Sequence, residues 1–201
     1  MNTAPDVTKL PPPSHDGGLA VEAALTGRRS IRDYKREPVD LGDVSQLLWA
    51  AQGMNRPGGY RTCPSAGALY PLELHVVAGR VNGLSPGIYR YDCTNHTVRI
   101  EAGGDIRQDL AGAALGQSMI YRAPVTVAIS GVFERTTCKY GERGIRYVFM
   151  EAGHAAQNIH LQAVSLNLGT VVIGAFRDDQ VKMVLGLNPD ESPLLLMPVG
   201  K

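Results

Sequence analysis

The spacing of apolar side chains along the chain predicts a mixed set of helices and strands. Apolar residues recur every three or four positions between Asp40 and Gly53, which is the spacing of one helix face, and these two residues are typical of helix ends. A longer helical pattern, 144–168, is apolar around most of its circumference, so we expect it to be covered on several sides, a second subunit being one candidate cover. Shorter helices are predicted at 19–25, 105–115 (capped by Asp105) and 178–185.

Runs of alternating or β-branched apolar residues predict the strands. These runs lie at 73–78, 88–92, 97–100, 124–130, 170–174 and 194–199, and the second and third of them form a hairpin. Helices therefore gather around a mostly antiparallel central sheet, and the fold class is α+β. The stretch 54–71 has no periodicity and is rich in glycine, proline and other small residues. Two interpretations stay open for it: an ordinary surface loop, or a loop that a flat ligand approaches closely.

Length and composition indicate an ordinary globular protein. The chain has 201 residues, of which 44% are hydrophobic and 19% charged, and its net charge is +1. This balance gives no general reason to expect nucleic acid or a membrane surface as partner. Residues 1–18 are polar and proline-rich and predict a flexible N-terminal arm or strap, whereas 19–201 form a single domain. The lack of an apolar signal core and the three scattered cysteines predict a cytoplasmic protein with reduced thiols.

The most unusual local feature is a cluster of cations near the amino end. Arg28, Arg29, Ser30 and Arg32 place three guanidinium groups and a hydroxyl within five residues. Guanidinium forks match pairs of phosphate oxygens, and a serine hydroxyl can complete such a site. A phosphate site and a solvated basic corner are both compatible with this pattern.

Several familiar sites are absent from the sequence. There is no G-x-G-x-x-G or G-x-x-x-x-G-K-[ST] phosphate loop, no C-x-x-C pair, no H-E-x-x-H and no G-x-S-x-G. No metal site is therefore predicted. What remains is the arginine cluster, a small-residue loop at 64–68, a Gly174-Ala175 turn after a strand and a terminal Lys201. A phosphate tail attached to a planar ring, bound without a Rossmann loop, suggests flavin mononucleotide (FMN).

The same segments resemble the nitroreductase superfamily of flavoproteins over nearly all of 19–201. The matching pieces are Arg28-Arg29-Ser30-Ile31-Arg32, Pro64-Ser65-Ala66-Gly67-Ala68, Val172-Ile173-Gly174-Ala175-Phe176 and Pro198-Val199-Gly200-Lys201. Further segments resemble the azoline-oxidising dehydrogenase branch, which converts azoline rings in modified peptides to azoles. They are Leu69-Tyr70-Pro71, Lys139-Tyr140-Gly141-Glu142-Arg143 and the run from Glu151 to Asn158.

The resemblance implies an intertwined homodimer with two FMN sites at its interface. It assigns the phosphate to Arg28, Ser30 and Lys201, the pyrimidine edge of the ring to Arg32, and the ribityl or phosphate region to Arg29. The other subunit would contribute Pro64, Ser65, Ala66 and Gly67. Backbone N–H groups of Gly174 and Ala175 would lie near the flavin N5, and Gln117 would be a further contact.

The resemblance also implies the chemistry. The chain would be an FMN-dependent oxidoreductase that takes hydride from NADH or NADPH and passes it to a small molecule. An azoline dehydrogenase acting on a modified peptide is one alternative, and a non-catalytic flavin-binding protein is another. In the azoline-oxidising branch, a pair like Lys139 and Tyr140 is thought to help remove a proton as hydride leaves; a solvent-facing turn before the long helix is the other interpretation of this pair. Cys63, beside the small-residue loop, is expected to pack rather than react.

Overall fold

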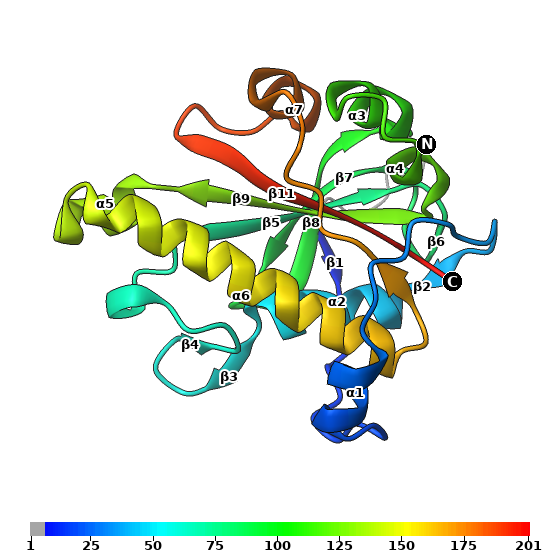
Figure 1. The fold of residues 1–201 in the computed structure, drawn as a ribbon, viewed down its shortest axis with the longest axis horizontal. Helices are drawn as coiled ribbons and strands as arrows, with labels where there is room; N and C mark the ends of the chain where they lie inside the picture. Colours follow the sequence, from blue (N-terminus) through cyan, green and yellow to red (C-terminus); the bar gives the residue numbers. More distant parts are fainter. Residues whose placement is uncertain (1–6) are drawn as a thin grey trace.

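One antiparallel sheet organises the molecule (Figure 1). The computed structural model describes residues 7–201, and within them seven strands pair in the order β1-β8-β7-β5-β9-β11-β10. Every neighbouring pair in this sheet is antiparallel, which confirms the expected α+β class with a mostly antiparallel sheet. The strands are β1 (Val7–Lys9), β5 (Leu72–Ala78), β7 (Gly87–Asp92), β8 (Thr97–Gly103), β9 (Val125–Val132), β10 (Gly169–Thr170) and β11 (Glu191–Gly200).

Short strands and helices complete the described chain. Two small pairs lie outside the main sheet: β2 (Val39–Asp40) with β6 (Val81–Asn82), and β3 (Met54–Arg56) with β4 (Tyr60–Arg61). The helices are α1 (Val21–Gly27), α2 (Leu41–Gln52), the 3-10 turn η1 (Ala66–Ala68), α3 (Arg107–Ala113), α4 (Ser118–Arg122), α5 (Glu134–Tyr140), α6 (Arg143–Ser165) and α7 (Asp178–Leu185). Among residues 7–201, no helix combines the length and apolar character that crossing a membrane requires.

Helices cover both faces of the sheet. Successive side chains of a strand point to opposite faces, and neighbours such as Val76 and Val77 accordingly belong to two different core clusters. The cluster with Val76 contains the buried residues of α2 and α6, and the cluster with Val77 contains those of α3 and α7. The central strand β9 is buried along its whole length because both of its faces are covered.

The two main helices follow from local signals in the sequence. Asp40 and Asp43 form a capping box at the start of α2, as the acidic residues there predict. The long helix α6 buries an alanine-rich face, including Ala152, Ala155 and Ala163, against the sheet. Its opposite face is less covered than expected, because Ile145, Phe149 and Met150 are 42%, 55% and 57% exposed in the single chain.

Several elements differ from the sequence prediction, mostly because long-range pairing decides them. The first residues of the predicted arm, 1–6, lie outside the described chain, but Val7–Lys9 pairs with β8 and Leu10 is buried, where no packed element was predicted. The stretch 54–71 holds the β3–β4 pair and η1 rather than a plain loop. The strand predicted at 170–174 is limited to Gly169–Thr170 and one bridge from Ile173 to Leu196.

Helix boundaries also differ in places. Helices α4 and α5 were not predicted, since each is short and has a weak apolar pattern. Helix α3 begins at Arg107 with Ile106 at its cap. Asp105 instead accepts hydrogen bonds from the backbone N–H of Arg107 (3.2 Å) and from its guanidinium (2.8 Å).

A buried polar network joins four strands of the sheet, β5, β7, β9 and β11. Glu191 lies 3.1 Å from His75 Nε2 and 3.3 Å from Ser130 Oγ, and its other oxygen accepts a hydrogen bond from Arg90. Burial alone would raise the pKa of Glu191, but the hydrogen bond and charge of His75, together with Arg90, lower it to about 2. The carboxylate is therefore ionised at neutral pH although it is fully buried.

Candidate functional site

The arginine cluster forms an extended segment beside β10. Ser30 bridges Thr170 in parallel, and the backbone N–H of Ile31 donates to the Thr170 carbonyl at 2.9 Å. Alternation along an extended chain places Arg28, Ser30 and Arg32 on one side and Arg29 on the other. The structure agrees, because Arg28 and Arg29 line two different pockets.

The pocket of Arg28 is mainly apolar. Its volume is about 340 Å³, and its polar lining among the described residues consists of Arg28, Gln157 and His160. The apolar walls come from α6, from the chain after β10 and from β11, namely Phe149, Ala152, Gly153, Ala156, Val172, Leu194 and Leu195. A concave apolar pocket with one cation at its edge suits a planar ring that carries an anionic group.

The cations of the cluster are not neutralised within the described chain. No carboxylate of residues 7–201 lies within ion-pair distance of Arg28, Arg29 or Arg32. Burial lowers the pKa of His160, and the charge of Arg28 lowers it further, so this histidine is neutral at pH 7. The sequence analysis assigned no role to His160, because nothing in its local spacing places it beside Arg28.

Arg29 already has backbone partners. Its guanidinium donates to the carbonyls of Thr26 (2.7 Å) and Arg28 (2.9 Å), which satisfies acceptors at the end of α1. The pocket that it lines is a smaller one of about 200 Å³, against the last turns of α6. The flavin contact expected of Arg29 stays a prediction.

The Gly174-Ala175 turn presents free backbone groups near Gln117. Both residues of the turn are exposed, and their N–H groups donate no hydrogen bond to any described residue. Gln117 Nε2 donates to the Ala175 carbonyl at 2.7 Å, so the structure brings these predicted residues together. The predicted phosphate contact Lys201 is exposed, and its carbonyl accepts a hydrogen bond from the backbone N–H of Lys35 at 2.7 Å. Burial raises the pKa of Asp43, and the charge of Lys201 partly opposes this rise.

A second group forms around the small-residue loop. A Cβ placed on Gly67 would lie 2.8 Å from Tyr140 Oη and 3.0 Å from Lys139 Nζ, so this loop and the end of α5 are in contact. Lys139 and Tyr140 therefore form the end of a short helix beside the loop, with Lys139 exposed to solvent and Tyr140 half-buried. The predicted catalytic pair and the loop residues Pro64, Ser65, Ala66 and Gly67 thus lie together on one chain.

Glu151 of α6 fixes this loop. Its Oε1 accepts a hydrogen bond from the backbone N–H of Ala66 at 2.8 Å, and Ser65 Oγ accepts one from the Tyr70 N–H at 2.9 Å. Burial raises the pKa of Glu151, while the bonds from Ala66 and Ser65 oppose the rise. Cys63 is buried here, and burial with the nearby Glu151 raises the pKa of its thiol to about 12, as expected for a packing role.

The loop holds two non-glycine residues in the left-handed region. Ala68 has φ +54° and Tyr70 has φ +46°, which is unfavourable for residues with a side chain. The Arg61 guanidinium lies 4.6 Å from the centre of the Tyr70 ring, and Arg135 donates to the Tyr70 carbonyl at 3.1 Å. Such strain, held by surrounding contacts, is often found at functional sites.

The two groups lie toward opposite ends of α6 (Figure 1). The loop is bound through Glu151, whereas α1, which leads into Arg28, packs at Val164, where a Cβ on Gly27 would meet its side chain at 3.0 Å. The Arg28 pocket extends along α6 from His160 to Phe149, but none of the loop residues 64–67 lines it. One chain therefore does not bring loop 64–67 to the arginine cluster.

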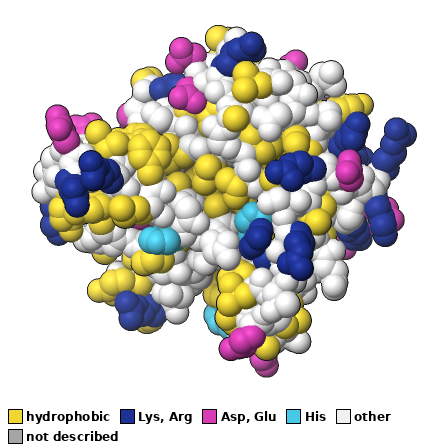
Figure 2. Space-filling model, in the orientation of Figure 1, with side chains coloured by type: hydrophobic (Ala, Val, Ile, Leu, Met, Phe, Trp, Pro, Cys, Tyr) yellow, Lys and Arg dark blue, Asp and Glu magenta, His cyan; other side chains and the backbone are white. Residues whose placement is uncertain are grey.

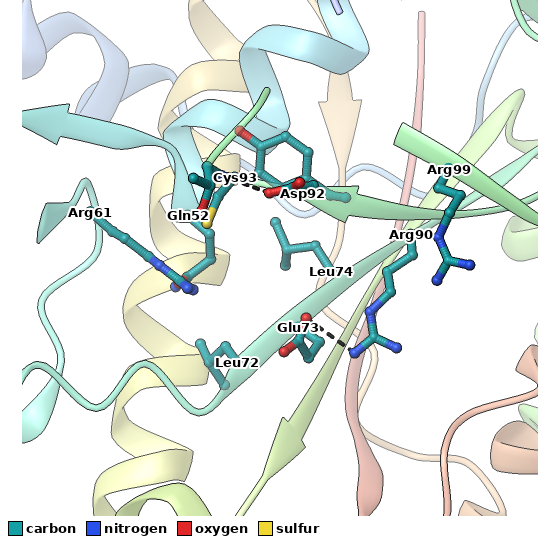
Figure 3. A pocket seen from close by; sticks show the side chains of 11 residues that line it. Gln52, Arg61, Leu72, Glu73, Leu74, Arg90, Asp92, Cys93 and Arg99 are labelled. Carbon is teal, nitrogen blue, oxygen red and sulfur yellow. Dashed lines mark hydrogen bonds and ion pairs between the residues drawn. The ribbon is translucent and has the colours of Figure 1, made fainter. Parts of the chain in front are cut away.

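A further polar pocket beside the loop is shown in Figure 3. It has a volume of about 330 Å³, with Arg61 on one side and Arg90 and Arg99 on the other. Its cations have partners: Arg61 donates to Gln52 (2.8 Å), Arg90 pairs with Glu73 (3.2 Å), and Arg99 pairs with Glu101 (2.9 Å). This pocket is therefore less suited to an anion than the pocket of Arg28.

Comparison with known proteins identifies the family to which the chain belongs. The model of the nitroreductase family matches residues 25–201. A protein of Methanocaldococcus jannaschii named "Putative nitroreductase MJ1384" is 45% identical over 183 residues, which cover 91% of each chain. The trifolitoxin operon protein TfxC of Rhizobium leguminosarum is 29% identical over 96% of this chain and 59% of its own length.

Solved structures share the fold. One is the crystal structure of a "putative nitroreductase" from Ralstonia eutropha. It superposes with a TM-score of 0.84 at 29% identity, over 100% of this chain and 91% of that one. A chain of the E. coli microcin synthetase McbBCD complex superposes with a TM-score of 0.74 at 23% identity, over 96% and 77%, which shows the fold alone. On the family model and these relatives, the chain belongs to the nitroreductase family of oxidoreductases.

Proposed function

We propose that this protein is an FMN-dependent oxidoreductase that works as a homodimer. The observation that carries the proposal is the separation of the two groups: Lys139 and Tyr140 contact the loop at Gly67, but no residue of loop 64–67 lines the Arg28 pocket. In a homodimer, the Arg28 pocket of one subunit would face the partner's loop 64–67, so that two composite sites form. The cytoplasmic location that we propose is compatible with three free cysteines.

The exposed face of α6 supports the dimer. Ile145, Phe149 and Met150 leave an apolar strip on this helix, and Figure 2 shows apolar side chains gathered along α6 on that face. Contiguous apolar surface of this kind is typical of an interaction site. Phe149 also lines the Arg28 pocket, so the same strip reaches the candidate site.

The residues of the pocket fit FMN. Arg28, which forms no ion pair within residues 7–201, supplies a cation for a phosphate, with Ser30 on the same side of the chain, and the apolar walls suit a planar ring. In the segment that follows β10, Val172 lines the pocket, and the N–H groups of Gly174 and Ala175 donate to no described residue, so two backbone donors are available there. When bound, FMN would supply two-electron hydride chemistry. The protein would orient it, exclude water with the α6 face and stabilise negative charge through Arg32.

The electron donor and acceptor are also proposals. We propose NADH or NADPH as donor and a small molecule as acceptor, in the direction that the family name suggests. Oxidation of an azoline in a modified peptide is a second candidate, favoured by one contact: Lys139 and Tyr140 lie against loop 64–67, where they would face the flavin of a composite site. A relative from the trifolitoxin operon is compatible with this candidate.

The visible spectrum of the purified protein and its Arg28→Ala variant test the proposal. We expect a yellow protein of dimeric size whose flavin absorbance bleaches on anaerobic addition of NADPH. Arg28→Ala should stay folded and bind FMN at least about tenfold more weakly, because a hydrogen bond to a charged group contributes about 1.5–3 kcal/mol. Arg56→Ala removes an exposed cation from the β3–β4 pair and is the matched control.

Three outcomes would contradict parts of the proposal. A colourless monomer that does not bind added FMN would exclude the flavin site. Unchanged FMN affinity in Arg28→Ala would remove the phosphate role of this residue. A stable yellow dimer that neither NADH nor NADPH can bleach would exclude the reductase function. Azoline oxidation and a non-catalytic flavin carrier would remain, and only the first would oxidise a synthetic azoline peptide.

A further inference from the structure

The chain just after the arginine cluster contributes to a second cationic pocket. It has a volume of about 600 Å³ and is lined, among the described residues, by Tyr34, Arg36, Arg80, Tyr121 and Arg122. It shares no lining residue with the Arg28 pocket and none with the predicted flavin contacts. Figure 2 shows Lys and Arg side chains gathered on the edge of the molecule that carries β2, β6 and the C-terminus in Figure 1. Backbone hydrogen bonds join Lys35 to Lys201 and Arg80 to Val39 of β2.

Backbone hydrogen bonds fix the walls of this pocket. The N–H groups of Gly79 and Arg80 both donate to the Pro124 carbonyl, at 3.0 and 2.9 Å, and the Arg80 carbonyl accepts from Val39 at 3.2 Å. The Tyr34 hydroxyl lies 2.8 Å from the carbonyl of Ile31 and 3.1 Å from that of Pro198. Arg80 and Tyr34 are thus held in place by the fold.

Arg80 has an unused donor inside the protein. Its Nη2 donates to the Arg122 carbonyl at 2.7 Å, but its Nε is buried and has no hydrogen-bond partner among the described residues. Burial lowers the pKa of this guanidinium, and Arg107 and Arg36 lower it further, while Asp105 opposes them. Unsatisfied buried donors are rare in folded proteins and call for an explanation.

Few carboxylates balance these charges. Asp105 is engaged with Arg107 at 2.6 Å, and Asp33 pairs with Arg122 at 3.3 Å in a largely exposed contact. Within residues 7–201, Arg36 and Arg80 form no ion pair. Guanidinium groups brought together without acids bind multivalent oxyanions well, because each offers a fork of donors.

The size and aromatic walls indicate more than a bare anion. A volume of about 600 Å³ lies in the range of small-molecule sites, roughly 300–1,000 Å³. Tyr121 is 51% exposed and Tyr34 is half-buried, so both rings are available at the pocket wall. Planar groups pack favourably on such rings.

We propose that this pocket binds a small phosphorylated ligand with a planar group, the chemistry of a nucleoside monophosphate. The phosphate would contact Arg36, Arg80 and Arg122, and the planar group would pack on Tyr34 and Tyr121. Because the pocket shares no lining residue with the Arg28 pocket, this inference does not depend on the oxidoreductase assignment.

Isothermal titration calorimetry of the full chain with adenosine 5′-monophosphate (AMP) tests this site. The variants are Arg36→Gln and Arg122→Gln, both of exposed residues whose loss leaves the core intact, with Arg56→Gln as matched control. We expect each pocket variant to weaken AMP binding at least about tenfold, as for loss of a charged hydrogen bond. Inorganic phosphate should compete with AMP, whereas adenosine should not.

Each remaining outcome would overturn the proposal. No AMP binding by the wild-type protein up to about 5 mM, beyond the weak end of specific affinities, would exclude the site. Equal affinity of the pocket variants and Arg56→Gln would show that AMP binds elsewhere. Loss of AMP binding in Arg28→Ala alone would assign AMP to the Arg28 pocket, and adenosine binding as tightly as AMP would show that the arginines do not recognise a phosphate.

Discussion

Glu151 ties the small-residue loop to the long helix, so we expect Glu151→Ala to loosen the loop without unfolding the chain. The change removes the acceptor of the Ala66 N–H, a 2.8 Å bond to a carboxylate that is only 4% exposed. Hydrogen bonds to charged groups contribute about 1.5–3 kcal/mol. Water can reach the half-buried Ala66, and burying the carboxylate is itself costly, so we expect a loss of about 1–2 kcal/mol in the free energy of unfolding.

Urea unfolding and an FMN titration measure the two consequences separately. The stability loss should appear in the absence of any flavin, and under the proposed function the looser loop should also weaken FMN binding by about tenfold. Glu151→Gln keeps an oxygen acceptor and should lose less than half as much. Glu142→Ala is the control, because this exposed glutamate at the start of α6 makes no side-chain cap hydrogen bond. Unfolding of Glu151→Ala at the wild-type urea concentration, or an equal loss of stability in Glu142→Ala, would refute this role of Glu151.

Three further outcomes follow from the described contacts. Lys139→Ala and Tyr140→Phe should each keep the fold but slow turnover at least about tenfold in whichever direction the enzyme works, as expected for loss of proton transfer; full rates for both would show that the pair is not catalytic. Gly67→Ala should lower the free energy of unfolding by more than Gly186→Ala, because both glycines have φ near +62° but only the new methyl at Gly67 meets other side chains; equal losses in urea would argue against that contact. The pKa of Glu191 is lowered from 4.5 to about 2, so its contribution of about 3 kcal/mol to the free energy of unfolding is present above pH 4.5 and is lost as the pH falls toward 2. In this pH window, the free energy of unfolding should fall more steeply for the wild type than for Glu191→Gln. Identical slopes would contradict the network.

Local signals in the sequence were sufficient for the elements that local interactions define. Helix α2 begins at a capping box that can be recognised from Asp40 and Asp43, and α7 occupies the predicted 178–185. The β7–β8 hairpin also follows from adjacent runs. Strand β1, by contrast, exists only because β8 offers it an edge nearly ninety residues away, and no property of 7–9 alone predicts that pairing.

The candidate site was predicted as a list of residues but not as an arrangement. The motif identified Arg28 and Arg29 together, yet extended geometry sends their side chains into different pockets. Glu151 was visible only as part of a motif, because its role depends on how α6 lies against a loop that is distant in sequence. The pairing of Lys139 and Tyr140 with Gly67 is likewise a tertiary contact that spacing cannot reveal.

The short strand at the amino end has a practical consequence for handling this protein. By occupying the outer side of β8, Val7–Lys9 covers backbone donors and acceptors that would otherwise invite another molecule to extend the sheet. Truncating the chain to start at its arginine-rich segment would expose this edge of β8 and favour aggregation by strand pairing between molecules. Solubility tags are therefore better attached ahead of these residues than substituted for them.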